Sequence, residues 1–168
     1  EWQQSFGGSQ MDIASHIEQA SDGGFIISAT TESYGQGGKD IWLFKTSSSG
    51  LIEWNKYIGT PYDDYSGQVL ETNDGGFILI GSRGSSDQND NDIWLIKTNS
   101  QGDSSWTRSY GGNQFDRGND ILADDQGGFI LLGSTESQGN GGKDIWLLKV
   151  DEDGNNQWNN TYGNGSDD

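Results

Sequence analysis

The sequence has no cysteine, a single histidine (His16) and a single proline. Without cysteine the protein can form no disulfide bond, no thiolate nucleophile and no cysteine-ligated zinc site. One histidine, flanked by Ser15 and Ile17, argues against a histidine-based catalytic triad or a histidine-ligated zinc site. We therefore expect no enzyme activity, and no cofactor other than an optional calcium ion.

Positive charge is also scarce. Lys and Arg total 9 against 26 Asp and Glu, which gives a formal net charge of −17 at pH 7. Such a surface repels phosphate groups, so we expect neither a nucleic-acid partner nor binding to an anionic membrane. No stretch is long and apolar enough to predict a transmembrane span.

What the chain does contain is a repeat of 52 residues. Two motifs define it, Gly-Gly-Phe-Ile at 23–26, 75–78 and 127–130, and Asp-Ile-Trp-Leu at 40–43, 92–95 and 144–147. No insertion breaks the period, and three repeats leave a twelve-residue pattern that is present at both ends of the chain. We divide the chain into an extra segment at 1–12 and repeats at 13–64, 65–116 and 117–168.

Each repeat predicts four short strands. In the middle copy we expect them at about residues 68–72, 76–82, 92–98 and 104–110. The sequence Asn73-Asp74-Gly75 between the first two predicts a tight turn, because glycine adopts positive φ at no steric cost.

The third strand of each repeat is apolar on both sides. Ile93 and Leu95 point to one face of the sheet, while Trp94 and Ile96 point to the other. Both faces must therefore be covered, as happens when neighbouring blades of a β-propeller pack together. The predicted fold is all-β: a propeller-type array of three four-stranded antiparallel blades, plus one extra N-terminal strand.

Two tryptophan series follow the repeat. The third strands carry Trp42, Trp94 and Trp146. The fourth strands carry Trp2, Trp54, Trp106 and Trp158. We interpret the first series as blade-to-blade packing rather than sugar stacking, and expect the second to cap the outer blade edge or to dock onto the adjacent blade.

Acidic residues recur beside the predicted turns. The positions are Asp40, Asp92 and Asp144 in one series, and Asp12, Asp64, Asp116 and Asp168 in the other. Because every copy has them, we interpret them as acceptors of backbone N–H groups that brace the turns, and not as catalytic carboxylates.

Oxygen-rich loops can bind calcium, and two loops are candidates for such a site. One is the turn that contains Asp151, Asp153 and Asn155. The other is the long loop of the second repeat, which contains Asp87, Asp90 and Asp92. The equivalent turns of the other repeats are rich in serine, so calcium binding is not a property of the repeat itself.

Several short motifs carry a resemblance to a known family. They are Tyr110-Gly111-Gly112, Asp116, Gln126-Gly127-Gly128-Phe129-Ile130, Gly133-Ser134-Thr135 and Asp144-Ile145-Trp146. This pattern resembles the bacterial and archaeal β-propeller repeats called SBBP-type repeats, and the likeness covers essentially the whole chain. It implies an extracellular or cell-surface protein of a bacterium or archaeon, and it transfers no catalytic residue.

Two further features accompany the resemblance. A glycine four residues before a tryptophan, as in Gly50 and Trp54, is similar to the docking turn of quinoprotein propellers. Asn159 and Asn164 begin N-glycosylation acceptor sequences, which are compatible with an exported protein.

The count of blades predicts a partner. Propellers typically need about four to eight blades to close a ring. The three repeats supply only three blades, although the sequence of the fourth strand is present four times. Three explanations stay open: the chain is a fragment of a longer array, two copies form one closed ring of six blades, or the surplus strand pairs with another chain and extends into a fibre or tube.

These observations favour a non-enzymatic, exported structural or adhesive surface protein whose main partner is another copy of itself. The alternative is a propeller module that binds glycans or peptides on its axial loops. A third possibility is a fragment of a larger propeller enzyme.

Overall fold

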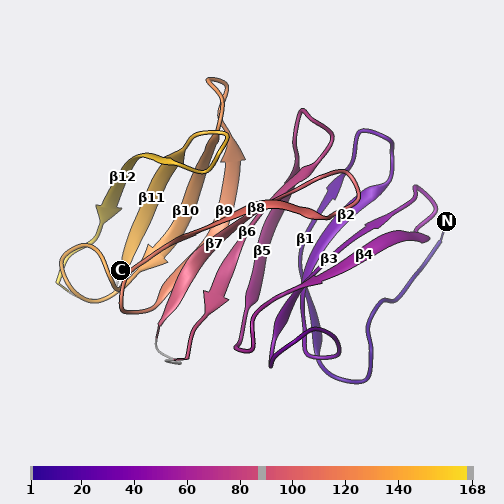
Figure 1. Ribbon diagram of the computed structural model, residues 1–168, viewed down its shortest axis with the longest axis horizontal. Helices are drawn as coiled ribbons and strands as arrows, with labels where there is room; N and C mark the ends of the chain where they lie inside the picture. The colour runs from indigo at the N-terminus through magenta and orange to yellow at the C-terminus, as the bar shows by residue number, and fades with distance from the viewer. Residues whose placement is uncertain (1, 87–89, 166–168) are drawn as a thin grey trace.

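The computed structural model describes residues 2–86 and 90–165, which form strands and no helix (Figure 1). The strands are β1 (Asp12–Gln19), β2 (Phe25–Thr31), β3 (Asp40–Thr46), β4 (Ile52–Ile58), β5 (Tyr65–Glu71), β6 (Phe77–Gly84), β7 (Asn91–Thr98), β8 (Ser104–Tyr110), β9 (Asp116–Ala123), β10 (Phe129–Thr135), β11 (Asp144–Val150) and β12 (Asn156–Tyr162). They form three four-stranded sheets, each with its strands in chain order. All neighbouring strands are antiparallel. One repeat makes one blade, and the predicted all-β array of three blades is confirmed.

Local signals in the sequence account for the shape of each blade. The predicted tight turn forms after β5, where Gly75 adopts a φ of 75° and the amide of Thr72 donates to the carbonyl of Gly76 at 2.9 Å. The strand β5 begins earlier than expected, at Tyr65, and its pairing with β6 passes through an irregularity between Ser66 and Val69. A β-bulge lets the two strands stay paired on both sides of an unmatched residue, which is why the strand is longer than its apolar pattern predicts.

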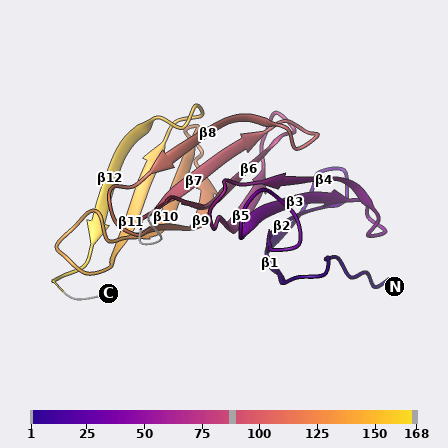
Figure 2. The same cartoon turned by 60° about the horizontal axis from the view of Figure 1, so that its bottom comes forward.

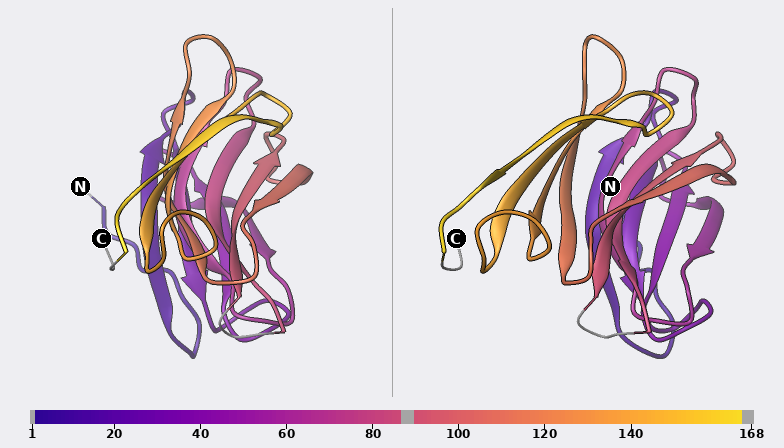
Figure 3. Two further views of the ribbon diagram at one scale, coloured as in Figure 1. Left: turned by 90° about the vertical axis from the view of Figure 1, so that its left-hand side faces the viewer. Right: turned by 60° about the vertical axis from the view of Figure 1, so that its left-hand side comes forward.

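The three blades form an open fan. The first strands β1, β5 and β9 lie side by side, and the fourth strands β4, β8 and β12 lie on the outer side (Figures 1 and 2). The first blade and the third blade lie at opposite ends of the row, as the side views also show (Figure 3). Each terminal blade therefore has one face that no other blade covers.

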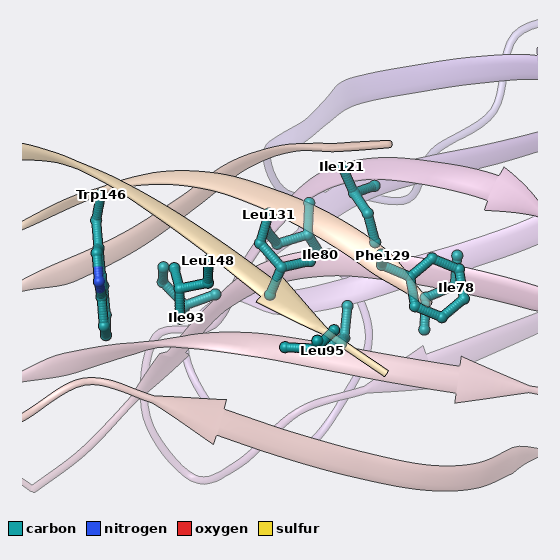
Figure 4. Packing of buried hydrophobic residues seen from close by; sticks show 10 residues of the cluster. Ile78, Ile80, Ile93, Leu95, Ile121, Phe129, Leu131, Trp146 and Leu148 are labelled. Atoms are coloured by element: carbon teal, nitrogen blue, oxygen red, sulfur yellow. The ribbon is translucent and has the colours of Figure 1, made fainter. Parts of the chain in front are cut away.

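The core lies at the two junctions between blades. Side chains from one face of the second blade pack against the opposite face of the third (Figure 4). From the second blade come Ile78, Ile80, Ile93 and Leu95, and from the third come Ile121, Phe129, Leu131, Trp146, Leu148 and Val150. The junction of the first and second blades is built at equivalent positions, with Ile26, Ile41 and Leu43 against Val69, Phe77, Leu79, Trp94 and Ile96. Trp94 and Trp146 lie in these junctions, whereas Trp42 packs among residues of the first blade and the N-terminal segment.

Each blade also holds a lysine beneath its first tight turn, a feature that the sequence analysis did not single out. The Nζ of Lys97, a residue only 9% exposed, donates to both carboxylate oxygens of Asp74 at 3.0 and 2.8 Å. Lys45 pairs with Asp22 in the same way in the first blade. In the third repeat Gln126 stands at the aspartate position, and Lys149 pairs with Asp124 instead. A buried ammonium group needs such a partner because leaving it unpaired is strongly unfavourable.

This ion pair predicts a pH dependence of stability. The hydrogen bonds from Lys97 lower the pKa of Asp74 from 3.8 to about 2. A lowered pKa in the folded state adds stability above pH 3.8, and that stability is lost as the pH falls from 3.8 towards 2. Because the Asp74 side chain is 66% exposed, solvent screening reduces the contribution to about 1 kcal/mol.

We expect Asp74→Asn to lower the free energy of unfolding by about 1–2 kcal/mol at pH 6, since the pair is only partly buried. The difference from the wild type shrinks as the pH falls to 2, where the Asp74 carboxyl is about half protonated in the folded state. The measurement is urea unfolding as a function of pH. Asp125→Asn, which removes the same charge from an exposed position, is the control. A deficit of Asp74→Asn that persists unchanged at pH 2 would contradict the role of the ion pair.

Candidate assembly interface

The N-terminal residues 2–11 lie outside the three sheets. A fourth strand pairs with the third strand of its own blade, whereas residues 2–6 pair with no strand and belong to no sheet. Their side chains nevertheless contact the first blade. The indole Nε1 of Trp2 donates to the carbonyl of Ser48 at 3.1 Å, and the ring of Phe6 lies 5.1 Å from that of Phe44.

Two members of the second tryptophan series, Trp54 and Trp106, dock onto the adjacent blade. The ring of Trp54 lies over Gly102 of the second blade, so closely that a Cβ at Gly102 would be 2.5 Å from it. The ring of Trp106 lies over Gly154 of the third blade in the same way, and here the Cβ would be 3.0 Å from the ring. We call the turn positions Gly50, Gly102 and Gly154 the docking glycines.

Residues 2–6 reproduce the contacts of a fourth strand. Trp2 covers the docking glycine Gly50, where a Cβ would again lie 2.5 Å from the ring. Phe6 packs against the apolar face of the first blade as Ile58 and Tyr110 pack against the faces of the next two. Trp158 has no docking glycine among the described residues, and its side chain is 40% exposed.

A groove of about 510 Å³ lies on the uncovered face of the first blade. Six of its lining residues correspond, by the 52-residue repeat, to the third-blade side of the second junction: Ile17, Phe25, Ile27, Trp42, Phe44 and Thr46. The groove and the junctions differ most clearly in how far the side chain at the position of Ile17 is exposed. This side chain is 60% exposed, whereas its equivalents Val69 and Ile121 are fully buried. The groove therefore has the residue pattern of one side of a junction, but no blade packs against it.

Aromatic side chains cover part of this surface. Trp42 is only 4% exposed, because the rings of Tyr34, Phe44 and Tyr57 pack around it. Tyr34 and Tyr57 stack on each other at 4.8 Å, and burial raises the pKa of Tyr57 above its ordinary value. The sequence analysis missed this pair. The available signal was that both positions are aromatic in the first repeat alone, since the other copies have Ser, Gln or Thr there.

The opposite end of the fan presents the residues equivalent to the second-blade side of that junction. Leu132 is 39% exposed and Ile145 is 45% exposed, whereas their equivalents Ile80 and Ile93 are fully buried against the third blade. Ile130 and Leu147 extend the same partly exposed apolar face.

Polar contacts across the junctions repeat as well. The hydroxyl of Thr30 accepts the backbone N–H of Ser66 at 3.0 Å, and the hydroxyl of Ser82 accepts that of Gly118 at 3.3 Å. In the 52-residue repeat, Ser134 on the third blade is equivalent to Ser82, and Ala14 on the first blade is equivalent to Ser66. The two uncovered faces therefore carry opposite halves of one contact.

Recurrent aspartates of both series accept backbone N–H groups at turns, as predicted, and Asp40 and Asp144 accept those of Gln36 and Asn140 at 3.1 and 2.9 Å. Asp12 accepts the backbone N–H of Gly8 at 2.8 Å, and Asp116 accepts that of Gly112 at 3.0 Å. Asp64 accepts the N–H of Gly84 at 2.8 Å. Burial raises the pKa of Asp64 despite these hydrogen bonds. Asp168 lies outside the described residues.

The first calcium candidate is also organised as a turn. Asp151 accepts the backbone N–H groups of Asp153 at 3.0 Å and of Asn155 at 2.8 Å, and the Asn155 side chain donates to its second oxygen at 3.0 Å. These hydrogen bonds, those from Asn155 foremost, lower the pKa of Asp151. Within residues 2–86 and 90–165, no group of three or more His, Asp or Glu side chains could hold a metal ion. Calcium at this turn stays a prediction.

The remaining predicted residues lie in the loop before β7, on β12 and just beyond β12. In the second calcium candidate, Asp90 accepts the hydroxyl of Ser85 at 3.3 Å, while Asp87 lies outside the described residues. Asn159 is exposed on β12 and accepts the indole N–H of Trp146 at 3.3 Å. Asn164 is exposed beyond β12. Glycosylation of either asparagine stays a prediction.

No protein-family model and no curated protein matches this chain. The resemblance to SBBP-type repeats therefore rests on the motifs alone. Among the described residues, no helix has both the length and the apolar character needed to cross a membrane.

Proposed function

We propose that the protein is a non-enzymatic structural component that assembles head to tail with copies of itself. The uncovered face of the third blade of one copy binds the groove on the first blade of the next. The observation that carries this proposal is the repetition of one junction twice within the chain, with its two halves presented at opposite ends. The same pair of surfaces already packs at both junctions inside each molecule.

The apolar residues supply the driving force. Association would bury Ile17, Leu132 and Ile145, which are 60%, 39% and 45% exposed in the single chain. At about 25 cal/mol per Å² of apolar surface, burial of each remaining exposed area contributes roughly 1 kcal/mol. The Ser134 hydroxyl and the Ala14 N–H would form the next junction hydrogen bond and would set the register of the two blades.

The net charge of −17 opposes this association. Acidic surfaces of two copies repel each other, and dissolved salt screens the repulsion over about 10 Å at 0.1 M ionic strength. Assembly is therefore expected to strengthen as salt is added, since both the screening and the burial of apolar surface favour it.

The location and role proposed for the assembly are an extracellular or cell-surface structure of a bacterium or archaeon, with a structural or adhesive function. The resemblance to SBBP-type repeats and the acceptor sequences at Asn159 and Asn164 support this part of the proposal.

Substitution of Ile145 tests the proposed interface. In sedimentation velocity over a range of concentrations, the wild type is expected to form species larger than the 18.3 kDa chain. Ile145→Arg places a charge at the centre of the third-blade face and is expected to weaken association at least about tenfold, as for a central contact residue. Because Ile145 is 45% exposed in the single chain, the variant should still fold.

Tyr62→Arg is the matched control. Tyr62 is similarly exposed, at 43%, but lies in the loop between the first two blades, and its repeat equivalents are the polar residues Gln10 and Gln114. It should associate like the wild type. A wild type that stays monomeric at every concentration and salt level would overturn the proposal, as would equal association of both variants.

A further inference from the structure

We propose that assembly proceeds by exchange of one tryptophan for another, in which Trp158 on β12 of one copy replaces Trp2 on the docking glycine Gly50 of the next copy. The inference rests on the proposed function and names the contact that controls it. Residues 2–6 are then an internal competitor of β12 for one binding site.

The two tryptophans are equivalent by the repeat. Trp54 and Trp106 show what this position does, since each covers the docking glycine of the following blade. A third blade bound to the groove in the same geometry brings Trp158 to Gly50. Trp2 already lies there, so close that even a Cβ at Gly50 would be 2.5 Å from its ring, and a second indole ring cannot occupy the same place. One of them must leave.

Sheet hydrogen bonds decide which ring stays. The strand β12 is paired with β11 from Ile145 opposite Tyr162 to Val150 opposite Asn156, so that Trp158 is held in place before association. Residues 2–6 belong to no sheet. Trp2 is 51% exposed and holds its position by the hydrogen bond to Ser48 and by ring contacts. A preorganised strand loses less conformational freedom on binding than a free segment does.

A tyrosine adds a second advantage for β12. At the internal junction the hydroxyl of Tyr110 donates to the carbonyl of the docking glycine Gly154 at 2.6 Å. The equivalent residue of β12 is Tyr162, and the equivalent acceptor is the carbonyl of Gly50. Residues 2–6 carry Phe6 at this position, which has no hydroxyl to donate. Exchange therefore gains a hydrogen bond that the resting chain does not make.

The competition predicts opposite effects for two like substitutions. Trp158→Ala removes the incoming ring and is expected to weaken association at least about tenfold, as expected for an interface tryptophan. Trp2→Ala removes the competing ring and is expected to strengthen association and speed its onset several-fold. Both side chains are substantially exposed in the single chain, at 40% and 51%, so neither variant loses core packing.

A second, conservative pair keeps the test independent of any disturbance of folding. Tyr162→Phe deletes only the incoming hydroxyl, and Phe6→Tyr gives the competitor the hydroxyl that it lacks. Both changes are expected to weaken association by about three- to tenfold, the usual range for one hydrogen bond. Sedimentation velocity and time-resolved light scattering of the whole chain measure both sets.

The outcomes separate this inference from the proposed function. Association that Trp2→Ala and Trp158→Ala weaken equally, or that Trp158→Ala leaves unchanged, overturns the exchange while head-to-tail assembly stands. A wild type that never associates overturns both. Strengthening by Trp2→Ala together with weakening by Trp158→Ala is the pattern that only the competition produces.

Discussion

Ile93→Ala is expected to lower the free energy of unfolding by about 3–4 kcal/mol, whereas Ile145→Ala is expected to lower it by about 1 kcal/mol. The two isoleucines hold the same position in successive repeats. Ile93 is fully buried at the junction with the third blade, and Ile145 is 45% exposed on the uncovered face. Removal of a buried isoleucine loses its transfer free energy and leaves a cavity, while removal of a half-exposed one leaves no cavity.

Urea unfolding at concentrations where the protein is monomeric measures this difference. The pair is its own control, because residue type, strand and backbone conformation are shared. Equal losses of stability at both positions would contradict the structure, since they would mean that the third-blade face is covered in the single chain.

The second large effect concerns the docking glycines. Gly102→Ala is expected to cost about 3 kcal/mol, while Gly75→Ala costs about 1 kcal/mol. The two glycines have nearly the same φ, 76° and 75°, so the strain of placing an alanine there is the same. They differ in their surroundings: the Cβ at Gly102 would lie 2.5 Å from the ring of Trp54, and at Gly75 it would meet nothing within 4 Å.

Unfolding free energies of the two variants, alone and combined with Trp54→Ala, check this explanation. In the background of Trp54→Ala the excess cost of Gly102→Ala over Gly75→Ala should disappear, because the clash is gone. If Gly102→Ala still destabilises the protein more than Gly75→Ala after Trp54 is removed, the cause of the difference lies in the turn and not in the contact between blades.

Much of the fold can be predicted from residue patterns because its determinants are local. Glycine at turn positions such as Gly75, and third strands that are apolar on both sides such as residues 93–96, predict the strands, the turns and the need for a blade on each face. The residue pattern does not predict the full length of β5, because a bulge between Ser66 and Val69 extends this strand. A bulge depends on how two strands pair, and neither strand alone carries that information.

The candidate interface could be predicted only in outline. The fourth-strand pattern is present four times and the other strand patterns three times, but periodicity treats all copies of a residue as equal. Val69, Ile121 and Ile17 are equivalent by sequence, and only the packing of blades makes the first two buried and the third 60% exposed. The pairing of Lys149 with Asp124, where Gln126 replaces the usual aspartate, is likewise a result of spatial proximity.

The repeat, the four-stranded blade, the turn-bracing aspartates and the two tryptophan series follow from the amino-acid sequence, because each depends on residues close together in the chain. Tertiary packing, in contrast, sets which tryptophan covers which glycine, how residues 2–6 make fourth-strand contacts without joining a sheet, and which blade faces stay uncovered at the two ends of the row. Those features arise from contacts between residues about 50 positions apart, such as Trp2 with Gly50 and Trp54 with Gly102, and burial there depends on which blade is the neighbour.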